Sequence, residues 1–315
     1  MSSCYSENIF TFKQSNSMRI ENIVFSHPSS GKEVSKIFSH GVNQSIQSWE
    51  FRKDKMNICS HENIDKAIFV NICPKNNVIV GLISNSPFIW NLEEGSASLI
   101  EELSHLKISS LVCLDSKDIF IATDRQHLQL CDWESKKVTQ TFEGDLRKYS
   151  VAIDHSLGIL ATCINSSIKV WDLSTNKEMF NFHKGDALIL ALHIFHVDST
   201  YLLISGGLDG YIKVWDLNTG KLAYCLHDDN NAPINSIAIE PIRNIVIVGR
   251  WNGSIELWDL KTGNKLCDFQ GHKNNRVRCV IVSPDNELIA SCGWDGMVKV
   301  WKIHNQLTKY AMLSY

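Results

Sequence analysis

A short motif recurs through the second half of the 315-residue sequence, and it constrains the fold more than any other feature. The copies are SSIKVWDL (166–173), DGYIKVWDL (209–217), NGSIELWDL (252–260) and DGMVKVWKI (295–303). Their tryptophans, called marker tryptophans below, are Trp171, Trp215, Trp258 and Trp301, spaced 44, 43 and 43 residues apart. A period of this length predicts an array of similar units, none of which can bury its apolar face alone.

Three weaker copies extend the period toward the N-terminus. The marker position in these copies is filled by Trp49, Trp90 and Cys131. In the third copy, Trp133 is an alternative marker if the register is shifted by two residues. We therefore predict seven units, which fill nearly the whole chain.

Within a unit, short β-rich runs alternate with turn residues. The last unit reads RVRCVIV, the turn SPDN, ELIASC, the Trp-Asp-Gly turn and then MVKVW. Pro-Asp and Asp-Gly pairs are hairpin signals, and a fourth run such as KLAYCL (221–226) follows the marker. Each unit is thus predicted to form four antiparallel strands.

The repeats resemble those of the WD40 repeat family, whose signature dipeptide is intact at residues 171–172, 215–216 and 258–259. The resemblance implies an all-β, seven-bladed β-propeller with four antiparallel strands per blade. We expect a single propeller domain over residues 20–315 and an N-terminal segment over residues 1–19. NIFTFKQS (8–15) and QLTKYAML (306–313) are two candidates for the strand that closes the ring.

Blades of this family often carry a hydrogen-bonded tetrad of His, Ser or Thr, Asp and Trp. The resemblance implies two such sets: His183, Ser205, Asp209 and Trp215 in the fifth blade, and His272, Ser291, Asp295 and Trp301 in the seventh. The same residue types make a catalytic triad, but no GxSxG segment accompanies them. We interpret both sets as structural.

Two tryptophans outside the marker positions lie where tight turns are expected. They are Trp251 in VGRWNG and Trp294 in SCGWDG, in neighbouring units. Tight turns favour Asn, Asp and Gly, so an aromatic ring at this place needs another explanation. The resemblance implies that the turn lies on the top face of the propeller, near its central channel.

Several polar residues are predicted to share this face. Arg276 and Arg278 alternate with Val277, so they point away from the core between blades. Trp and Arg are enriched in binding hot spots and stack on each other by cation–π contact. We expect a surface that binds an acidic or aromatic peptide or loop, formed by Trp251, Trp294, Arg276, Arg278, Asn235 and Arg250. Simple capping of the blades by the two rings is the alternative.

Composition and charge limit the classes of partner that we expect. The net charge of −3 gives no global basis for binding nucleic acid or an anionic membrane, and no run of 18 apolar residues occurs. The first residues lack the pattern of a secretory signal. Ten cysteines occur without a CxxC pair, so we expect free thiols and no zinc site. These features favour the cytoplasm, with nuclear entry as a further expectation.

The leading prediction is a non-enzymatic interaction module or scaffold without a cofactor, either a monomer or a subunit of a hetero-complex. The first alternative is a substrate receptor of a cullin-type ubiquitin ligase, because Trp258, Asp259 and Lys261 resemble a segment that some WD40 proteins use to bind the ligase adaptor. An enzyme acting at the channel mouth is the second, although no P-loop or HExxH motif occurs. Phosphoinositide binding is the third, although the paired-Arg motif is missing.

Overall fold

The computed structural model describes residues 8–303 with interruptions, and in several strands of the first half it describes the backbone alone. The interruptions are 14–18, 26–34, 42–45, 53–54, 61–66, 74–77, 84–85, 92–95, 104–107, 109, 114–118, 124–126, 133–134, 136, 144–150, 155, 165, 184–186, 198 and 228. From residue 187 to residue 303 the description is therefore almost continuous, and this part holds the candidate site.

The described residues are almost entirely β-structure, with one short 3-10 helix at Glu101–Leu103. Their strands form seven four-stranded antiparallel sheets, numbered here in chain order. The first sheet has β2 (Ile20–Phe25), β3 (Ser35–Gly41), β4 (Gln47–Arg52) and β5 (Lys55–Ser60). The second has β6 (Ala67–Cys73), β7 (Val78–Ile83), β8 (Ser86–Asn91) and β9 (Ser96–Leu99). The third has β10 (Ser110–Cys113), β11 (Ile119–Thr123), β12 (His127–Asp132) and β13 (Val138–Glu143).

The better described half contains the other four sheets. The fourth has β14 (Val151–Asp154), β15 (Ile159–Ile164), β16 (Ser167–Asp172) and β17 (Lys177–His183). The fifth has β18 (Ile189–Val197), β19 (Thr200–Gly207), β20 (Ile212–Asp216) and β21 (Lys221–Leu226). The sixth has β22 (Ile234–Glu240), β23 (Ile245–Arg250), β24 (Ser254–Asp259) and β25 (Lys265–Gln270). The last has β26 (Val277–Val282), β27 (Leu288–Gly293), β28 (Met297–Lys302) and β1 (Asn8–Lys13).

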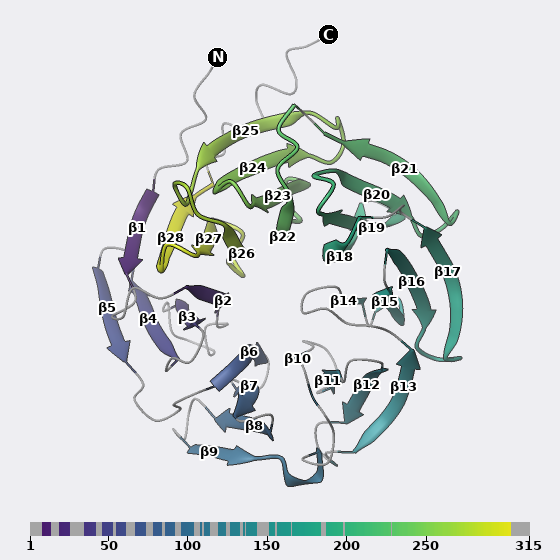
Figure 1. The fold of residues 1–315 in the computed structure, drawn as a ribbon, viewed down its shortest axis with the longest axis horizontal. Helices are drawn as coiled ribbons and strands as arrows, with labels where there is room; N and C mark the ends of the chain where they lie inside the picture. The colour runs from purple at the N-terminus through teal and green to yellow at the C-terminus, as the bar shows by residue number, and fades with distance from the viewer. Residues whose placement is uncertain are drawn as a thin grey trace.

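The sheets follow one another around a common centre, with the first strand of each nearest the centre and the outermost strand at the rim (Figure 1). Apolar side chains fill the space between neighbouring sheets. Ile255 of β24, Val277 of β26 and Trp301 of β28 belong to one buried cluster between the sixth and last sheets. Ile23 of β2 and Val298 of β28 belong to the next cluster, between the last and first sheets. Each sheet therefore buries its faces against its neighbours, as the repeat predicts.

In the third to sixth sheets the marker residues occupy one structural position. The register between the third and fourth strands shifts at Trp171, at Trp215 and at Trp258, so each bulge places the marker. In the third sheet the same shift falls at Cys131, which is fully buried. Cys131 is therefore the marker of this sheet, and the shifted register with Trp133, which lies outside the described residues, is wrong. Burial raises the pKa of the Cys131 thiol to about 12, so it packs as a neutral apolar group.

The last sheet takes its fourth strand from the other end of the chain. Strand β1 pairs antiparallel with β28, with Phe10 opposite Val300 and Phe12 opposite Val298. The predicted segment 8–15 thus supplies this strand, which ends at Lys13. The other candidate, residues 306–313, lies outside the described residues. Pairing β1 with β28 also brings the start of the first sheet beside the last one.

Candidate functional site

Two matched turns present Trp251 and Trp294. In the β23–β24 turn the Gly253 N–H donates to the Arg250 carbonyl at 3.2 Å, and in the β27–β28 turn the Gly296 N–H donates to the Gly293 carbonyl at 3.2 Å. Gly253 has φ +86°, and a Cβ there would collide with the backbone carbonyl of the following loop. The glycine after each Trp-Asn or Trp-Asp pair therefore fixes the turn that carries the ring.

The backbone of each tryptophan is also anchored. The Trp251 N–H donates to the Pro233 carbonyl at 2.9 Å, and the Trp294 N–H donates to the Arg276 carbonyl at 3.0 Å. The fifth sheet has the same bond, from the Leu208 N–H to a carbonyl just before β18. Leucine thus fills this position in a sheet of the same chain, so the fold itself does not demand an indole there.

Arginine side chains connect the two rings. The Arg276 Cζ lies 3.5 Å from the ring centroid of Trp251 and 4.4 Å from that of Trp294. The Arg19 Cζ lies 4.1 Å from the ring centroid of Trp294. Such a contact contributes about 0.5–2 kcal/mol, depending on how far it is removed from water. These four residues, called the Trp–Arg cluster below, hold one another in place.

A second layer of hydrogen bonds supports the cluster. The Asn235 Oδ1 accepts from Trp251 Nε1 at 3.3 Å and from Arg278 Nη1 at 3.2 Å, while its Nδ2 donates to the Val277 and Arg278 carbonyls. The Arg278 Nη2 and Nε bind one carboxylate oxygen of Glu21 at 2.6 and 3.0 Å. Asn235 is 4% exposed. It therefore orients Trp251, and the prediction that Asn235 belongs to the binding surface is wrong, because its side chain is buried and its amide group is used inside the protein.

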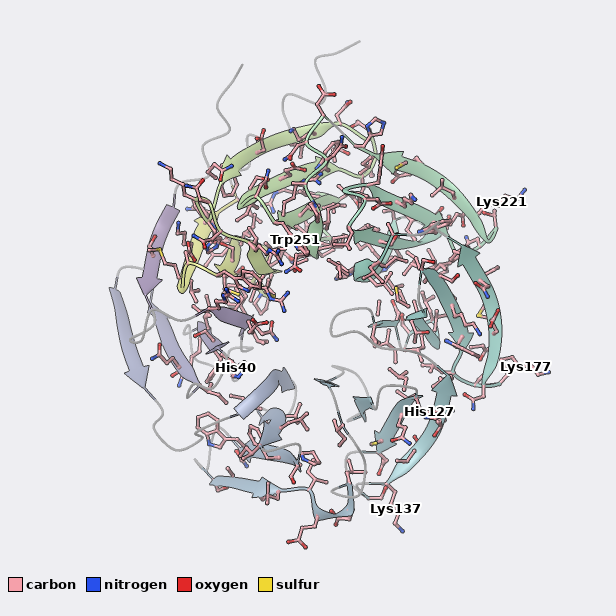
Figure 2. All side chains as sticks on the ribbon, viewed as in Figure 1. His40, His127, Lys137, Lys177, Lys221 and Trp251 are labelled. Atoms are coloured by element: carbon pink, nitrogen blue, oxygen red, sulfur yellow. The ribbon has the colours of Figure 1, made fainter. Side chains whose placement is uncertain are left out.

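The site spans three sheets. Trp251 and Asn235 belong to the sixth, Arg276 precedes β26 of the last, and Arg19 precedes β2 of the first. Trp251 lies at the inner end of the sixth sheet, facing the centre of the ring, whereas Lys177 and Lys221 project from the outer strands (Figure 2). Both tryptophans and Arg276 are half-buried, and Arg19 is exposed. One side of the cluster is thus open to solvent.

Arg250, a second residue predicted for this surface, is also buried. The Arg250 side chain is 0% exposed and pairs with the equally buried Glu256 through Nε at 2.8 Å. Its Nη1 donates to the Gly210 and Ala232 carbonyls. The prediction that Arg250 belongs to the binding surface is wrong, because β23 is buried along its whole length and its last side chain points into the protein.

Two site residues escaped sequence reasoning. Arg19 and Glu21 flank the start of β2, far from the other members in sequence. They reach the site because β26 and β2 lie beside each other. No local pattern marks them, whereas Arg276 and Arg278 lie where the alternation with the fully buried Val277 placed them.

The Ser, His and Asp of the last sheet bind one another. The His272 Nδ1 lies 2.8 Å from Asp295 Oδ1, its Nε2 lies 2.9 Å from Ser291 Oγ, and Trp301 Nε1 donates to Ser291 Oγ at 3.1 Å. Burial would raise the pKa of Asp295, but the hydrogen bond and charge of His272 hold this pKa below its usual value. His272 and Ser291 are 0% exposed, so the four side chains tie the last sheet together.

The marker indoles of the fourth and fifth sheets find similar partners. Trp215 Nε1 donates to Ser205 Oγ at 3.0 Å, and Asp209 pairs with Lys213 at 3.4 Å. The fourth member predicted for this sheet, the side chain of His183, lies outside the described residues. Trp171 Nε1 donates to Thr162 Oγ1 at 3.1 Å. Sequence reasoning missed Thr162 because it precedes its marker by nine residues instead of ten.

In the sixth sheet the marker indole N–H binds a charged side chain instead of a hydroxyl group. Val248 stands where other sheets have a hydroxyl, so Trp258 Nε1 donates instead to Glu256 Oε2 at 3.1 Å. The other oxygen of Glu256 binds Arg250 Nε and accepts from Asn230 Nδ2 at 2.8 Å. The burial of Arg250 is therefore explained by the carboxylate that replaces the missing serine.

The recurring marker, its hydrogen-bonded partners and the four-stranded sheets agree with a comparison to known families. The family model of the WD domain, G-beta repeat, matches residues 175–216, 220–259 and 263–302. Residues 175–302 therefore contain three WD40 repeats. Each matched WD40 repeat runs from the outer strand of one sheet through the three inner strands of the next. A comparison with curated proteins gave no match.

The WD40 dipeptide itself serves the fold. Trp258 is 3% exposed, and the Asp259 carboxylate accepts from the backbone N–H groups of Lys261 and Thr262 at 2.7 and 3.0 Å. Lys261 is exposed, while the two residues of the dipeptide are occupied by these contacts. A contact of Trp258, Asp259 and Lys261 with a ligase adaptor stays a prediction.

The described residues lack two features. They contain no group of three or more His, Cys, Asp or Glu side chains that is arranged to hold a metal ion. Across the same residues, no helix is long and apolar enough to cross a membrane.

Proposed function

We propose that this protein is a non-enzymatic scaffold that binds a peptide or loop of a partner protein on the Trp–Arg cluster. WD40 repeats generally serve protein–protein interaction. The observation that carries the proposal is the contact of Arg276 with both Trp251 and Trp294, which holds two half-exposed rings beside each other. Rings fixed in this way lose little freedom on binding, so they act as preorganised anchors.

Capping of the sheets explains the rings less well. Leu208 fills the equivalent turn of the fifth sheet with the same backbone hydrogen bond, so a smaller apolar residue is enough to cover a sheet. The indoles add surface and two cation–π contacts with Arg276 that the turn does not require. The second layer of Asn235, Arg278 and Glu21 further restricts their orientation.

We also propose that the seven sheets close into a seven-bladed β-propeller. Apolar clusters or strand contacts link each sheet to the two beside it, and β1 completes the last sheet. The Trp–Arg cluster then lies at the mouth of the central channel. A partner bound there would contact three blades at once.

The experiment that tests this function compares three forms of the full chain. Trp251→Leu/Trp294→Leu uses the residue that the fifth sheet already accepts, so the turns and the melting temperature should be kept. Lys177→Gln/Lys221→Gln changes two exposed residues at the rim and serves as the control. Each form captures partners from lysate, and quantitative mass spectrometry compares the captured proteins.

We expect a defined set of proteins to be retained by the wild type and by the rim variant and lost from the leucine variant. An unchanged set on the leucine variant, with the same melting temperature, would show that the rings only cover the sheets.

A further inference from the structure

The described arginine side chains divide into two groups. Arg243, Arg250 and Arg278 each form an ion pair with a glutamate. The guanidinium groups of Arg19 and Arg276 lie over the rings of Trp251 and Trp294, and among the described residues neither guanidinium group makes a hydrogen bond or an ion pair. Two guanidinium groups thus meet at one indole ring without an acceptor for their N–H groups.

Stacking leaves the binding edges of these groups usable. A guanidinium group that stacks on an aromatic ring contacts the ring with its flat face. The N–H donors of the guanidinium group point outward in its own plane, so they stay available to a ligand. Trp294 fixes where both groups lie, and Trp251 fixes Arg276 a second time. The nearest carboxylate of the supporting layer, Glu21, is already bound to Arg278. The local surface therefore carries two positive charges that nothing in the described protein neutralises.

The charge and geometry favour one kind of ligand group. A phosphoryl group carries about 1.5 to 2 negative charges at neutral pH and three acceptor oxygens, which suits two arginine forks. A carboxylate carries one charge and is satisfied by one fork. We propose that Arg19 and Arg276 bind the phosphoryl group of a phosphorylated serine or threonine in the partner segment, with Trp251 and Trp294 contacting the neighbouring side chains.

This inference rests on the proposed function, because it names the chemistry of a partner that the same surface binds. It also gives Arg19, the residue directly before β2, a direct role in binding. Recognition then depends on a modification of the partner, so the scaffold would distinguish two states of one protein.

The test uses three degenerate peptide libraries that differ only at a fixed central residue, which is phosphoserine, serine or glutamate. Fluorescence polarisation measures each pool against the purified full chain. We expect the phosphoserine pool to bind roughly tenfold or more tightly than the other two, since hydrogen bonds to charged groups are among the strongest in binding. Equal binding of the phosphoserine and serine pools, or equal binding of the glutamate pool, would overturn the inference.

Variants of the chain then locate the site. Arg19→Gln/Arg276→Gln should lower binding of the phosphoserine pool to the level of the serine pool, while Lys177→Gln/Lys221→Gln loses the same charge at the rim and should change little. Arg19→Gln alone is a safe second variant, because Arg19 is exposed. Arg276→Lys keeps the charge but removes the fork, so it should also weaken binding. Full binding by the double glutamine variant would place the phosphoryl group elsewhere.

The two proposals fail in different ways. If all three pools bind alike and the Trp251→Leu/Trp294→Leu variant binds none of them, the surface is an interaction site without a phosphoryl preference. If lysate partners are unaffected by the leucine variant, the proposed function itself fails.

Discussion

Single residues in this protein show how one structural requirement can be met by different chemistry. A marker indole N–H binds a serine hydroxyl in the last sheet, a threonine hydroxyl in the fourth and the Glu256 carboxylate in the sixth. The carboxylate is the costly solution, because a buried charge must be balanced by another one. Arg250 balances it and is thereby withdrawn from the surface.

The buried pair in the sixth sheet should matter far more than a partly exposed one. Arg250→Met leaves Glu256 charged and buried, so we expect the free energy of unfolding to fall by about 3–5 kcal/mol. Lys169→Met, which breaks the partly exposed pair with Glu178, should cost at most about 1 kcal/mol. Urea denaturation of the full chain measures both. Similar losses for the two variants would contradict this assignment of Arg250.

The last sheet should show a pH dependence that originates in Asp295. Its pKa in the folded protein lies below the usual value of about 3.9, so its ionised form stabilises the fold above that pH and this contribution is lost as the pH falls. Asp295→Asn should therefore reduce the free energy of unfolding at pH 7 and reduce it progressively less as the pH drops below about 4. A difference from wild type that does not change with pH would argue against an ionised Asp295.

At the level of elements, the sequence predicted the strands and turns that recur in every unit. It did not predict contacts that form only when distant units come together. The marker spacing and the hairpin signals predicted four-stranded units, and the alternation around Val277 oriented Arg276 and Arg278. The prediction for Arg250 failed, because a strand buried on both faces has no outward side. Arg19 had no signal, because only the neighbouring positions of β2 and β26 bring it to Trp294.

Strand β1 is the element on which the last sheet depends. Deleting residues 1–13 leaves the edge of β28 unpaired, so we expect a lower melting temperature and loss of amide protection along Met297–Lys302. Hydrogen exchange measured by mass spectrometry tests this, and protection of β14–β17 serves as the internal control. Unchanged protection of β28 would mean that β1 adds little to this sheet.

For the whole molecule, the Trp–Arg cluster lies where the first and last sheets meet. Arg19 comes from one end of the chain and Trp294 from the other, and the Glu21–Arg278 pair joins the same two sheets. A ligand held by Arg19 and Arg276 together would bind only the assembled junction. Binding and stability of the junction are then linked, so the ligand should also protect β1 and β28.

The same placement determines when the site can form during synthesis of the chain. Arg19 emerges early in synthesis, but the ring over which it lies is added 275 residues later, which takes roughly 15–60 s at about 5–20 residues per second. The intervening sheets can form before Trp294 is synthesised and contacts Arg19. A partner that recognises the cluster would therefore never engage a nascent or truncated chain, and its binding would report that translation has passed the last repeat.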